Sequence, residues 1–304
     1  MYIIVFNQNN IVNDGQNNKL VYRFPNSISL VDKYIAVTSI SLFYSWFNIT
    51  SLSQNNTLTY TWTAGAVTTT YSIVIPDGLY EISQINNYCQ WVMINNNTYW
   101  TDPSGDNVYP FEIILNPQRY AVQINTYLVP TALPVGYTIP VGFPGWPATT
   151  QNTVITIPAN FNSIIGYSAN FATNANVGNA YVPPSPSAST NYVAKDGAGT
   201  LSYLSNTSPQ VQPNNNVLFA LSTVNNPYTQ PGSIIYSLNP NVAVGEQIFE
   251  VPPNFAWCKL IDGMYSELRL NLLNTSLQPL LINDPNMTIL LAIRDKDEGF
   301  LMSK

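Results

Sequence analysis

The sequence contains no histidine, and its 304 residues include only two cysteines. Histidine is the commonest general base, the usual activator of a serine or cysteine nucleophile and a frequent metal ligand. The two cysteines have no spacing that resembles a metal site, and phosphate-binding, zinc and EF-hand motifs are absent. We therefore expect no enzymatic activity, no catalytic residue, no cofactor and no metal.

Charge is also scarce, because Lys, Arg, Asp and Glu make up 9% of the chain against about 25% in an ordinary soluble domain. The ten basic residues are scattered and the net charge is -6, which disfavours direct binding of nucleic acid. A surface with few charges has little to desolvate and suits permanent burial against neighbours. Drift in an AT-rich genome would explain the abundant asparagine, but it would not explain the scarcity of lysine.

Long apolar segments are missing as well. The apolar start at Met1–Phe6 is too short for a signal peptide and has no basic lead. No stretch approaches the roughly 20 apolar residues that a membrane span needs. We expect no membrane span and no secretory signal. Cys89 and Cys258 are then expected to be buried thiols, with a disulfide between them as the alternative.

The sequence is rich in aromatic and β-branched residues, which favours a folded all-β protein over a disordered chain. Short β-rich runs alternate with Asn, Gly, Pro and Ser clusters. Apolar residues change to helical spacing only from about 78 to 94, with Asp77 as the expected N-cap. The expected strands are Tyr2–Phe6, Leu20–Phe24, Lys33–Phe43, Thr57–Trp62, Thr69–Ile75, Val108–Leu115, Arg119–Leu128, Val217–Thr223, Ser233–Leu238, Gln247–Val251, Phe255–Ile261, Tyr265–Leu273 and Met287–Arg294.

About a dozen strands and one short helix predict a two-sheet sandwich, most simply a single jelly roll. We assign 1–127 and 213–295 to its core, 128–212 to long outward loops or a small insertion with some core strands, and 296–304 to a charged tail. The segment Pro130–Pro147 is rich in Pro and Gly and carries Tyr137, Phe143 and Trp146. These aromatic residues predict that it packs on a neighbour or on its own domain.

The acidic residues fit turns better than catalysis, since Asp77-Gly78, Asp262-Gly263 and Asp284-Pro285 are turn sequences. A glycosidase that uses paired carboxylates, with Glu246 and Glu250 as the residues to test, is the enzymatic alternative.

Three segments carry a resemblance to a known family. They are Ile75–Tyr88, Phe161–Tyr167, which looks like a strand-and-turn signature, and the C-terminal third from Tyr203 to Pro285. The last includes Pro253-Asn254-Phe255-Ala256-Trp257 and Leu260-Ile261-Asp262-Gly263-Met264-Tyr265. In order and spacing they resemble penton proteins of virophages and Polinton-type double-stranded DNA viruses, mavirus-like pentons in particular.

The resemblance covers most of the chain outside roughly 128–150 and 172–200. It implies a minor capsid protein that forms homopentamers at the fivefold vertices of an icosahedral virion, among double jelly-roll major capsid proteins, after assembly inside the host cell. Tyr137, Phe143, Trp146, Trp257 and Tyr265 are the interface candidates. The alternative is a receptor- or carbohydrate-binding spike or fibre head, in which Tyr137, Phe143 and Trp146 would line a sugar site.

Overall fold

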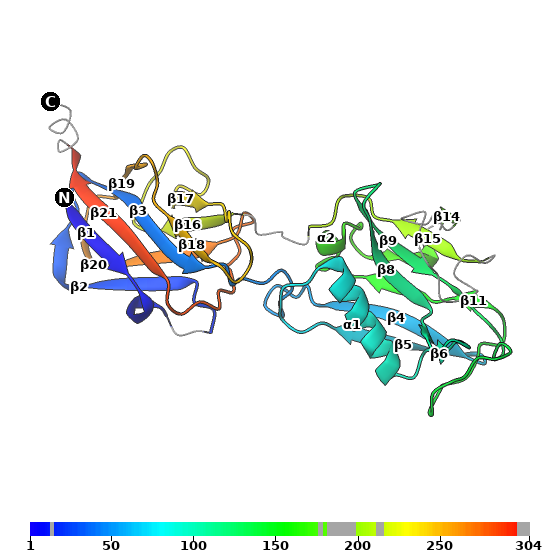
Figure 1. Cartoon of the computed structure of the whole chain (residues 1–304). Coiled ribbons are helices and arrows are strands. Elements are labelled where there is room, and N and C mark those ends of the chain that lie inside the picture. The colour runs from blue at the N-terminus through cyan, green and yellow to red at the C-terminus, as the bar shows by residue number, and fades with distance from the viewer. Residues whose placement is uncertain (13–14, 176–178, 181–198, 211–215, 297–304) are drawn as a thin grey trace. The chain divides into compact units, whose positions relative to one another are not determined.

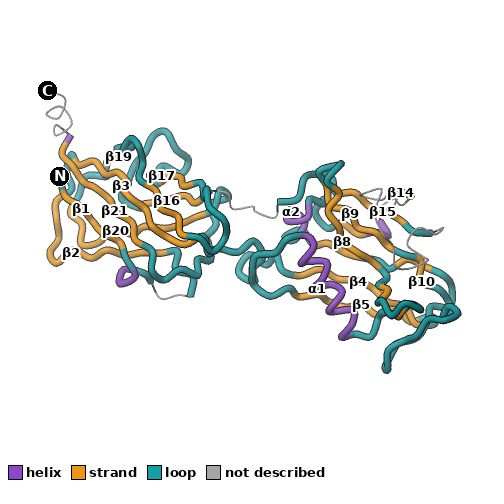
Figure 2. Tube along the Cα trace, viewed as in Figure 1, coloured by secondary structure: helices purple, strands orange, loops and turns teal. Residues whose placement is uncertain are grey.

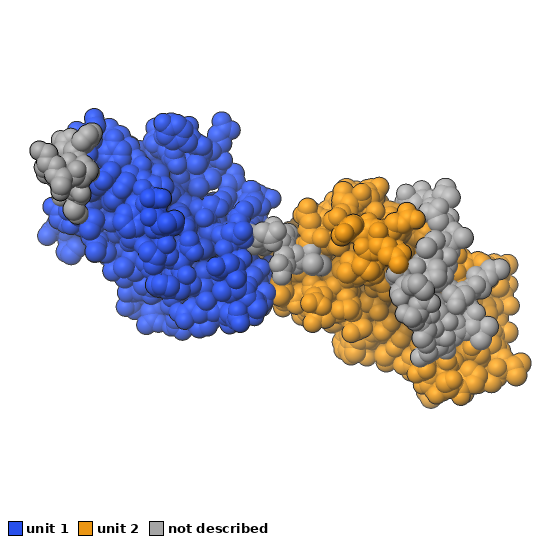
Figure 3. All heavy atoms as spheres, turned by 45° about the horizontal axis from the view of Figure 1, so that its top comes forward, with its two compact units in different colours: residues 1–47, 214–304 blue, residues 48–213 orange. Residues whose placement is uncertain are grey.

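The computed structural model describes all residues except 13–14, 176–178, 181–198, 211–215 and 297–304. The chain forms two compact units (Figure 3): unit 1 consists of residues 1–47 and 214–304, and unit 2 of residues 48–213. Unit 1 is thus built from both ends of the chain, and unit 2 is one continuous insertion. Strands dominate both units (Figure 2).

Unit 1 is a sandwich of two antiparallel sheets. Sheet I has the order β1-β21-β3-β18, with β19 paired to β3, and sheet II has the order β17-β16-β20-β2. The described elements of unit 1 are β1 (Tyr2–Phe6), a 3-10 turn (Gln8–Asn10), β2 (Lys19–Ser29), β3 (Lys33–Phe43), β16 (Val217–Leu221), β17 (Ile234–Leu238), β18 (Gln247–Glu250), β19 (Cys258–Lys259), β20 (Met264–Leu273) and β21 (Thr288–Asp295).

The strand order of unit 1 is that of a jelly roll. When its eight longer strands are counted along the chain, sheet I holds the first, eighth, third and sixth, and sheet II holds the fifth, fourth, seventh and second. This alternation between two antiparallel sheets is the arrangement of two interlocked Greek keys. The predicted all-β jelly roll is therefore confirmed, and it lies wholly within unit 1 (Figure 1).

The core of unit 1 follows from strand periodicity. Within the expected strand Tyr265–Leu273, Leu270 and Leu272 are fully buried between the sheets. Leu270 lies opposite Leu20 of β2, and Leu272 lies opposite Phe219 of β16. Each buried side chain of this size stabilises the fold by roughly 1.5–3 kcal/mol.

Unit 2 is a second β-sandwich. Sheet III has the order β13-β12-β4-β5 and sheet IV the order β14-β15-β9-β8. Its described elements are β4 (Thr57–Ala64), β5 (Val67–Val74), α1 (Ile82–Asn95), β6 (Trp100–Thr101), β7 (Asn107–Val108), β8 (Phe111–Asn116), β9 (Ala121–Thr126), β10 (Leu128–Val129), β11 (Gln151–Asn152), β12 (Ile155–Ile157), α2 (Asn162–Ile165), β13 (Phe171–Ala172), a 3-10 turn (Thr173–Ala175), β14 (Asn179–Ala180) and β15 (Leu201–Leu204).

Helix α1 completes the core of unit 2, where it packs against β8 (Figure 1). Its residues Ile85 and Cys89 are fully buried in one cluster with Leu58 of sheet III and Ile124 of sheet IV. The predicted alternation of Thr57–Trp62 is confirmed, because Leu58, like the other apolar residues of that run, faces the interior. Unit 2 thus buries its own apolar core, as an independent domain does.

The domain boundary differs from the expected one. The segment 48–127, predicted to be jelly-roll core, belongs to unit 2, which occupies the connection between β3 and β16. Strands of two antiparallel sandwiches share the same period of two, so periodicity cannot assign a strand to a sheet. Within 128–212 the structure describes short strands of unit 2, not jelly-roll strands. Apart from Lys296, the predicted tail 296–304 lies outside the described residues.

The helix predicted from about 78 to 94 is present, but it begins at Ile82. The backbone N–H of Glu81 donates to the side chain of Gln84 at 2.9 Å, so Glu81 takes the position expected for Asp77. Asp77 instead accepts hydrogen bonds from the N–H and hydroxyl of Ser51. The strand-and-turn expected at Phe161–Tyr167 is the short helix α2 followed by a left-handed glycine.

Both cysteines are free and buried, Cys89 in the core of unit 2 and Cys258 in the core of unit 1. The alternative of a disulfide between them is therefore wrong. Burial raises the pKa of the Cys89 thiol to about 12.

Candidate interaction surfaces

Four of the five exposed residues on the outer face of sheet I are apolar, and the fifth is Gln247. Ile3 and Val5 alternate with buried residues of β1, and Phe43 and Phe249 do the same at the end of β3 and on β18. The register connects these strands, since Ile3 lies opposite Ala292 of β21 and Phe249 lies opposite Ser41 of β3. Four exposed apolar side chains therefore share one face, which we call the sheet I face. The sheet I face comprises Ile3, Val5, Tyr34, Ala36, Ser39, Ser41, Phe43, Gln247, Phe249, Thr288, Leu290, Ala292 and Arg294.

Trp257, one of the expected interface residues, lies at the edge of the sheet I face. The guanidinium carbon of Arg294 is 4.1 Å from the centre of its ring, a cation–π contact. Phe255 meets Trp257 edge to face at 6.2 Å and is itself exposed. Among the sheet I face residues, all of which are described, Arg294 alone is charged, and Trp257 covers it.

The outer face of sheet II is chemically different. Arg23 of β2 lies opposite Glu267 of β20, and the Glu267 carboxylate also accepts hydrogen bonds from Arg269 at 2.5 and 2.7 Å. The two outer faces of the jelly roll therefore differ, one apolar and one charged.

Tyr265, a second expected interface residue, makes its described contacts within unit 1. It packs against the core, and its hydroxyl donates to the carbonyl of Ile261 at 2.8 Å. The structure therefore gives Tyr265 a place in the fold of unit 1.

Tyr137, Phe143 and Trp146 come together in unit 2. They pack half-buried on a cluster that includes Trp62 and Trp100, with Phe143 edge to face on Trp62 at 5.5 Å and Trp146 edge to face on Trp100 at 5.4 Å. The prediction that this loop packs on a neighbour or on its own domain is resolved for these three rings, which pack on their own unit.

The same loop is also held by hydrogen bonds. The indole N–H of Trp62 donates to the carbonyl of Gly145 at 3.0 Å. Gly65, at the β4–β5 turn, donates to Trp146 and accepts from Ala148. The loop base is therefore fixed to the β4–β5 hairpin.

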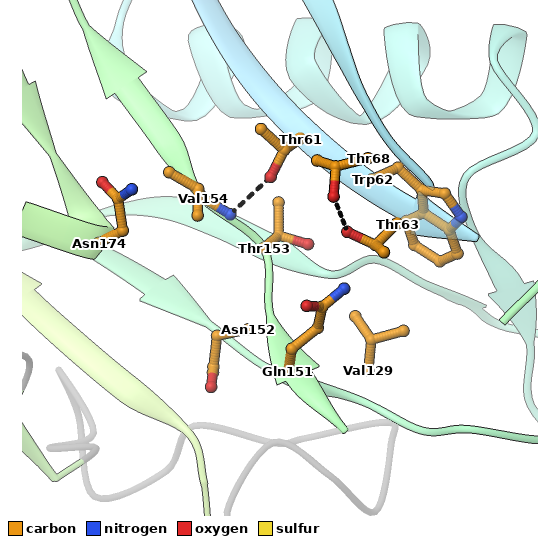
Figure 4. A pocket seen from close by; sticks show the side chains of 10 residues that line it. All are labelled: Thr61, Trp62, Thr63, Thr68, Val129, Gln151, Asn152, Thr153, Val154 and Asn174. Atoms are coloured by element: carbon orange, nitrogen blue, oxygen red, sulfur yellow. Dashed lines mark hydrogen bonds between the residues drawn. The ribbon is translucent and has the colours of Figure 1, made fainter. Parts of the chain in front are cut away.

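A pocket of about 230 Å³ opens between β4, β5 and the segment 151–154 (Figure 4). Its lining contains no charged side chain; the ten residues are Thr61, Trp62, Thr63, Thr68, Val129, Gln151, Asn152, Thr153, Val154 and Asn174. Thr63 and Thr68 share a hydrogen bond at 2.9 Å across its wall. The side chains of Gln151 and Thr153 make no hydrogen bond with a described residue, so they are available to a ligand.

Comparison with solved structures finds two virophage proteins that align over nearly the whole chain. No family model and no curated protein matches the sequence. The mavirus penton protein is 8% identical over 96% of this chain and 98% of its own, with a TM-score of 0.36. The Sputnik virophage structure is 10% identical over 98% of this chain and 99% of its own, with a TM-score of 0.37. At these scores the likeness carries no argument about function, and the jelly roll rests on its own strand order.

The carboxylates serve the fold. Asp284 accepts from the backbone N–H groups of Phe43 and Asn286, as a turn residue does. Glu246 accepts from the N–H of Ala243, and Glu250 from the hydroxyl of Tyr236.

Within the described part of the chain, no cluster of three or more Cys, Asp or Glu residues could hold a metal ion. Neither helix described in the chain has the length and hydrophobicity that crossing a bilayer would demand.

Sequence analysis missed a buried polar network on sheet IV. The amide of Gln123 donates to Asn125, which donates in turn to the carboxylate of Glu112, and the hydroxyl of Tyr127 also contacts Glu112. All six residues of β9 are buried, so this strand is covered on both faces. The alternation of Gln123 and Asn125 with apolar residues was the available signal, but it normally marks a wetted face.

Proposed function

We propose that the chain is a structural minor capsid protein whose jelly-roll unit forms homopentameric rings at the fivefold vertices of an icosahedral viral capsid. In this proposal the neighbours of the ring are double jelly-roll major capsid proteins, and the insertion unit 48–213 is free to make contacts beyond the ring. The chain then works through shape and contact and has no enzymatic role.

The sheet I face is the observation that carries this proposal. Exposed Ile3, Val5, Phe43 and Phe249 are costly to leave in water when they share one face, and such patches mark protein contacts. Another copy of the same chain is a partner that is present wherever the chain is made. Because the two outer faces of unit 1 differ, contact between unlike faces gives a head-to-tail interface, which makes a ring when the rotation closes.

Native mass spectrometry of the whole chain tests the ring. We expect a pentamer for the wild-type protein and a monomer for the double variant Ile3→Asp and Phe249→Asp, since each aspartate would have to be buried unpaired. Tyr228→Asp is the matched control, because Tyr228 is 94% exposed but lies in a loop outside the five strands of sheet I. The control should remain pentameric.

Co-assembly with a major capsid protein covers the case in which the ring forms only on the shell. A reconstruction of such particles should show unit 1 at the fivefold vertices. A wild-type chain that stays monomeric alone and is missing from the vertices of those particles would refute the proposal.

A second candidate function, binding of a receptor carbohydrate, is supported by the uncharged pocket of unit 2. Free amide and hydroxyl groups on Gln151 and Thr153 suit a neutral hydroxylated ligand. The sugar-stacking role proposed for Tyr137, Phe143 and Trp146 has less support, because their rings pack on Trp62 and Trp100. Titration with a panel of neutral monosaccharides by NMR should shift signals of Gln151, and Gln151→Ala should abolish binding; no shift at saturating sugar removes this candidate.

A further inference from the structure

The loop Pro130–Pro147 holds four aliphatic side chains that its own unit leaves exposed in whole or in part. Val135 is 99% exposed and Val141 is 98% exposed, and Leu133 and Ile139 beside them are 40% and 43% exposed. We call these four residues the loop tip. No residue from 130 to 147 carries a charge. An isolated exposed apolar side chain is ordinary, but four within nine residues on one charge-free loop need a partner.

The loop tip is held in place from within. The N–H of Tyr137 donates to the carbonyl of Pro134 at 3.1 Å, and the N–H of Phe143 donates to Pro140 at 3.2 Å, so each proline begins a turn. Thr138 exchanges two backbone hydrogen bonds with Thr101, at 2.8 and 2.9 Å. The valines are therefore kept away from the body of unit 2, and little ordering is needed when they meet a partner.

The chemistry of the loop changes from tip to base. The tip is aliphatic, and the half-buried aromatic residues Tyr137, Phe143 and Trp146 lie at the base, packed on Trp62 and Trp100. Side chains in a bilayer are distributed by depth in the same way. Aliphatic groups enter the hydrocarbon, and aromatic rings favour the interface with water.

We propose that the loop tip inserts into the interfacial layer of an electrically neutral lipid bilayer. A protein partner fits less well, because a stable protein interface buries about 800 Å² on each side, more than four aliphatic side chains on one loop supply. Lipid has no such requirement, because binding grows with each apolar group inserted.

The charges of unit 2 select the kind of lipid. Its only basic residues are Arg119 and Lys195, against six acidic ones. Gly136 of the loop lies beside Pro103, in the turn that also holds Asp102 and Asp106. Anionic lipid gains no attraction from such a surface, so phosphatidylcholine should serve and salt should have little effect.

The test places an environment-sensitive fluorophore on Val135→Cys in the whole chain and titrates phosphatidylcholine vesicles to millimolar lipid. The native thiols are buried and stay unlabelled. We expect the fluorescence to shift to the blue when vesicles are added. When Leu133→Asp and Val141→Asp are also introduced, we expect the partition coefficient into the vesicles to fall to about a tenth or below. Labelled Tyr228→Cys, equally exposed on unit 1, should show no shift.

Three outcomes would overturn the inference. They are an unchanged Val135→Cys signal at the highest lipid concentration, a shift that requires anionic lipid and disappears in salt, and a shift produced by a major capsid protein but by no vesicle. Ring formation would raise the avidity of the loop tip, but the partition of a single chain is measurable without it. Native mass spectrometry of the same samples therefore separates failure of this inference from failure of the proposed ring.

Discussion

Units 1 and 2 are both sandwiches of two antiparallel sheets, yet their surfaces differ. Unit 1 carries eighteen of the 26 charged residues and has one apolar and one charged outer face. Unit 2 carries only eight, and its special features are an uncharged pocket, a buried polar network and an apolar loop tip. One kind of architecture thus carries two different surfaces, each on its own packed core.

The largest expected effect comes from replacing one glycine of unit 2, which should destabilise that unit relative to unit 1. Gly166 has a φ of +77°, and a Cβ atom there would lie 2.2 Å from the carbonyl oxygen of Thr207. We expect Gly166→Ala to destabilise unit 2 by about 3–5 kcal/mol, from the overlap and the left-handed backbone together. Thermal unfolding should then show unit 2 melting well before unit 1.

Gly105→Ala is the control for this prediction, because Gly105 also has a positive φ in unit 2 but has open space around it. It should cost about 1 kcal/mol. Equal losses for the two variants would mean that the contact with Thr207 does not limit this position.

The converse experiment weakens unit 1. Leu270 is fully buried opposite Leu20. We expect Leu270→Ala to cost about 2–5 kcal/mol through lost burial and the cavity that it leaves. Denaturant unfolding followed at Trp257, which lies in unit 1, should move to lower concentration, and signals from unit 2 should stay; a common shift would show that the cores unfold as one.

A single hydroxyl gives a smaller effect in unit 2. The Tyr167 hydroxyl accepts from the N–H of Ile124 and donates to the carbonyl of Tyr203. Tyr167→Phe leaves that N–H without its partner and should cost about 1–3 kcal/mol, measured by chemical denaturation. A neutral effect would indicate that water replaces the hydroxyl.

Alkaline pH should act more strongly on unit 2 than on unit 1. Burial raises the pKa of Tyr60 to about 12 and raises that of Tyr167 further. The unfolded state releases these protons first, so their stability contribution is present below pH 10 and is lost as pH rises above it. One pH unit above 10, each such tyrosine removes about 1.4 kcal/mol. Denaturation at increasing pH in the Tyr167→Phe background should show a weaker dependence.

The smallest effect is expected on the charged outer face of sheet II. Glu267 pairs with Arg23 and Arg269, all at least partly exposed. Glu267→Gln should cost about 0–1 kcal/mol, because exposed ion pairs are screened by water and salt. A larger loss in the assembled protein than in the isolated chain would place this face inside a subunit contact.

Sequence alone predicted the jelly-roll strands well where one face is buried. Tyr2–Phe6 and Lys33–Phe43 have the expected bounds, because apolar residues at period two define such strands. It did not predict that Thr57–Trp62 lies in another sandwich, since β12, the strand that pairs with β4 on the side away from β5, is distant in sequence and places Ile155 opposite Tyr60. Sheet membership depends on long-range pairing, which local pattern does not encode.

The candidate site shows the same limit. Tyr137, Phe143 and Trp146 were identified as residues that need partners, and the structure provides those partners within unit 2. The exposed Val135 and Val141 were not identified, because an aliphatic residue in a loop gives the same sequence signal whether it is covered or not. The exposure of the two valines follows from the turns at Pro134 and Pro140 and from the packing of the loop's aromatic residues on unit 2.

Each unit contains one buried thiol, and the rate at which that thiol is alkylated reports how often the unit opens. Cys258 reacts only when unit 1 opens, and Cys89 only when unit 2 opens, because each is buried in its own core. Timed alkylation followed by peptide mapping would therefore record two opening rates in the native sequence, and would show which unit opens first when the protein is heated.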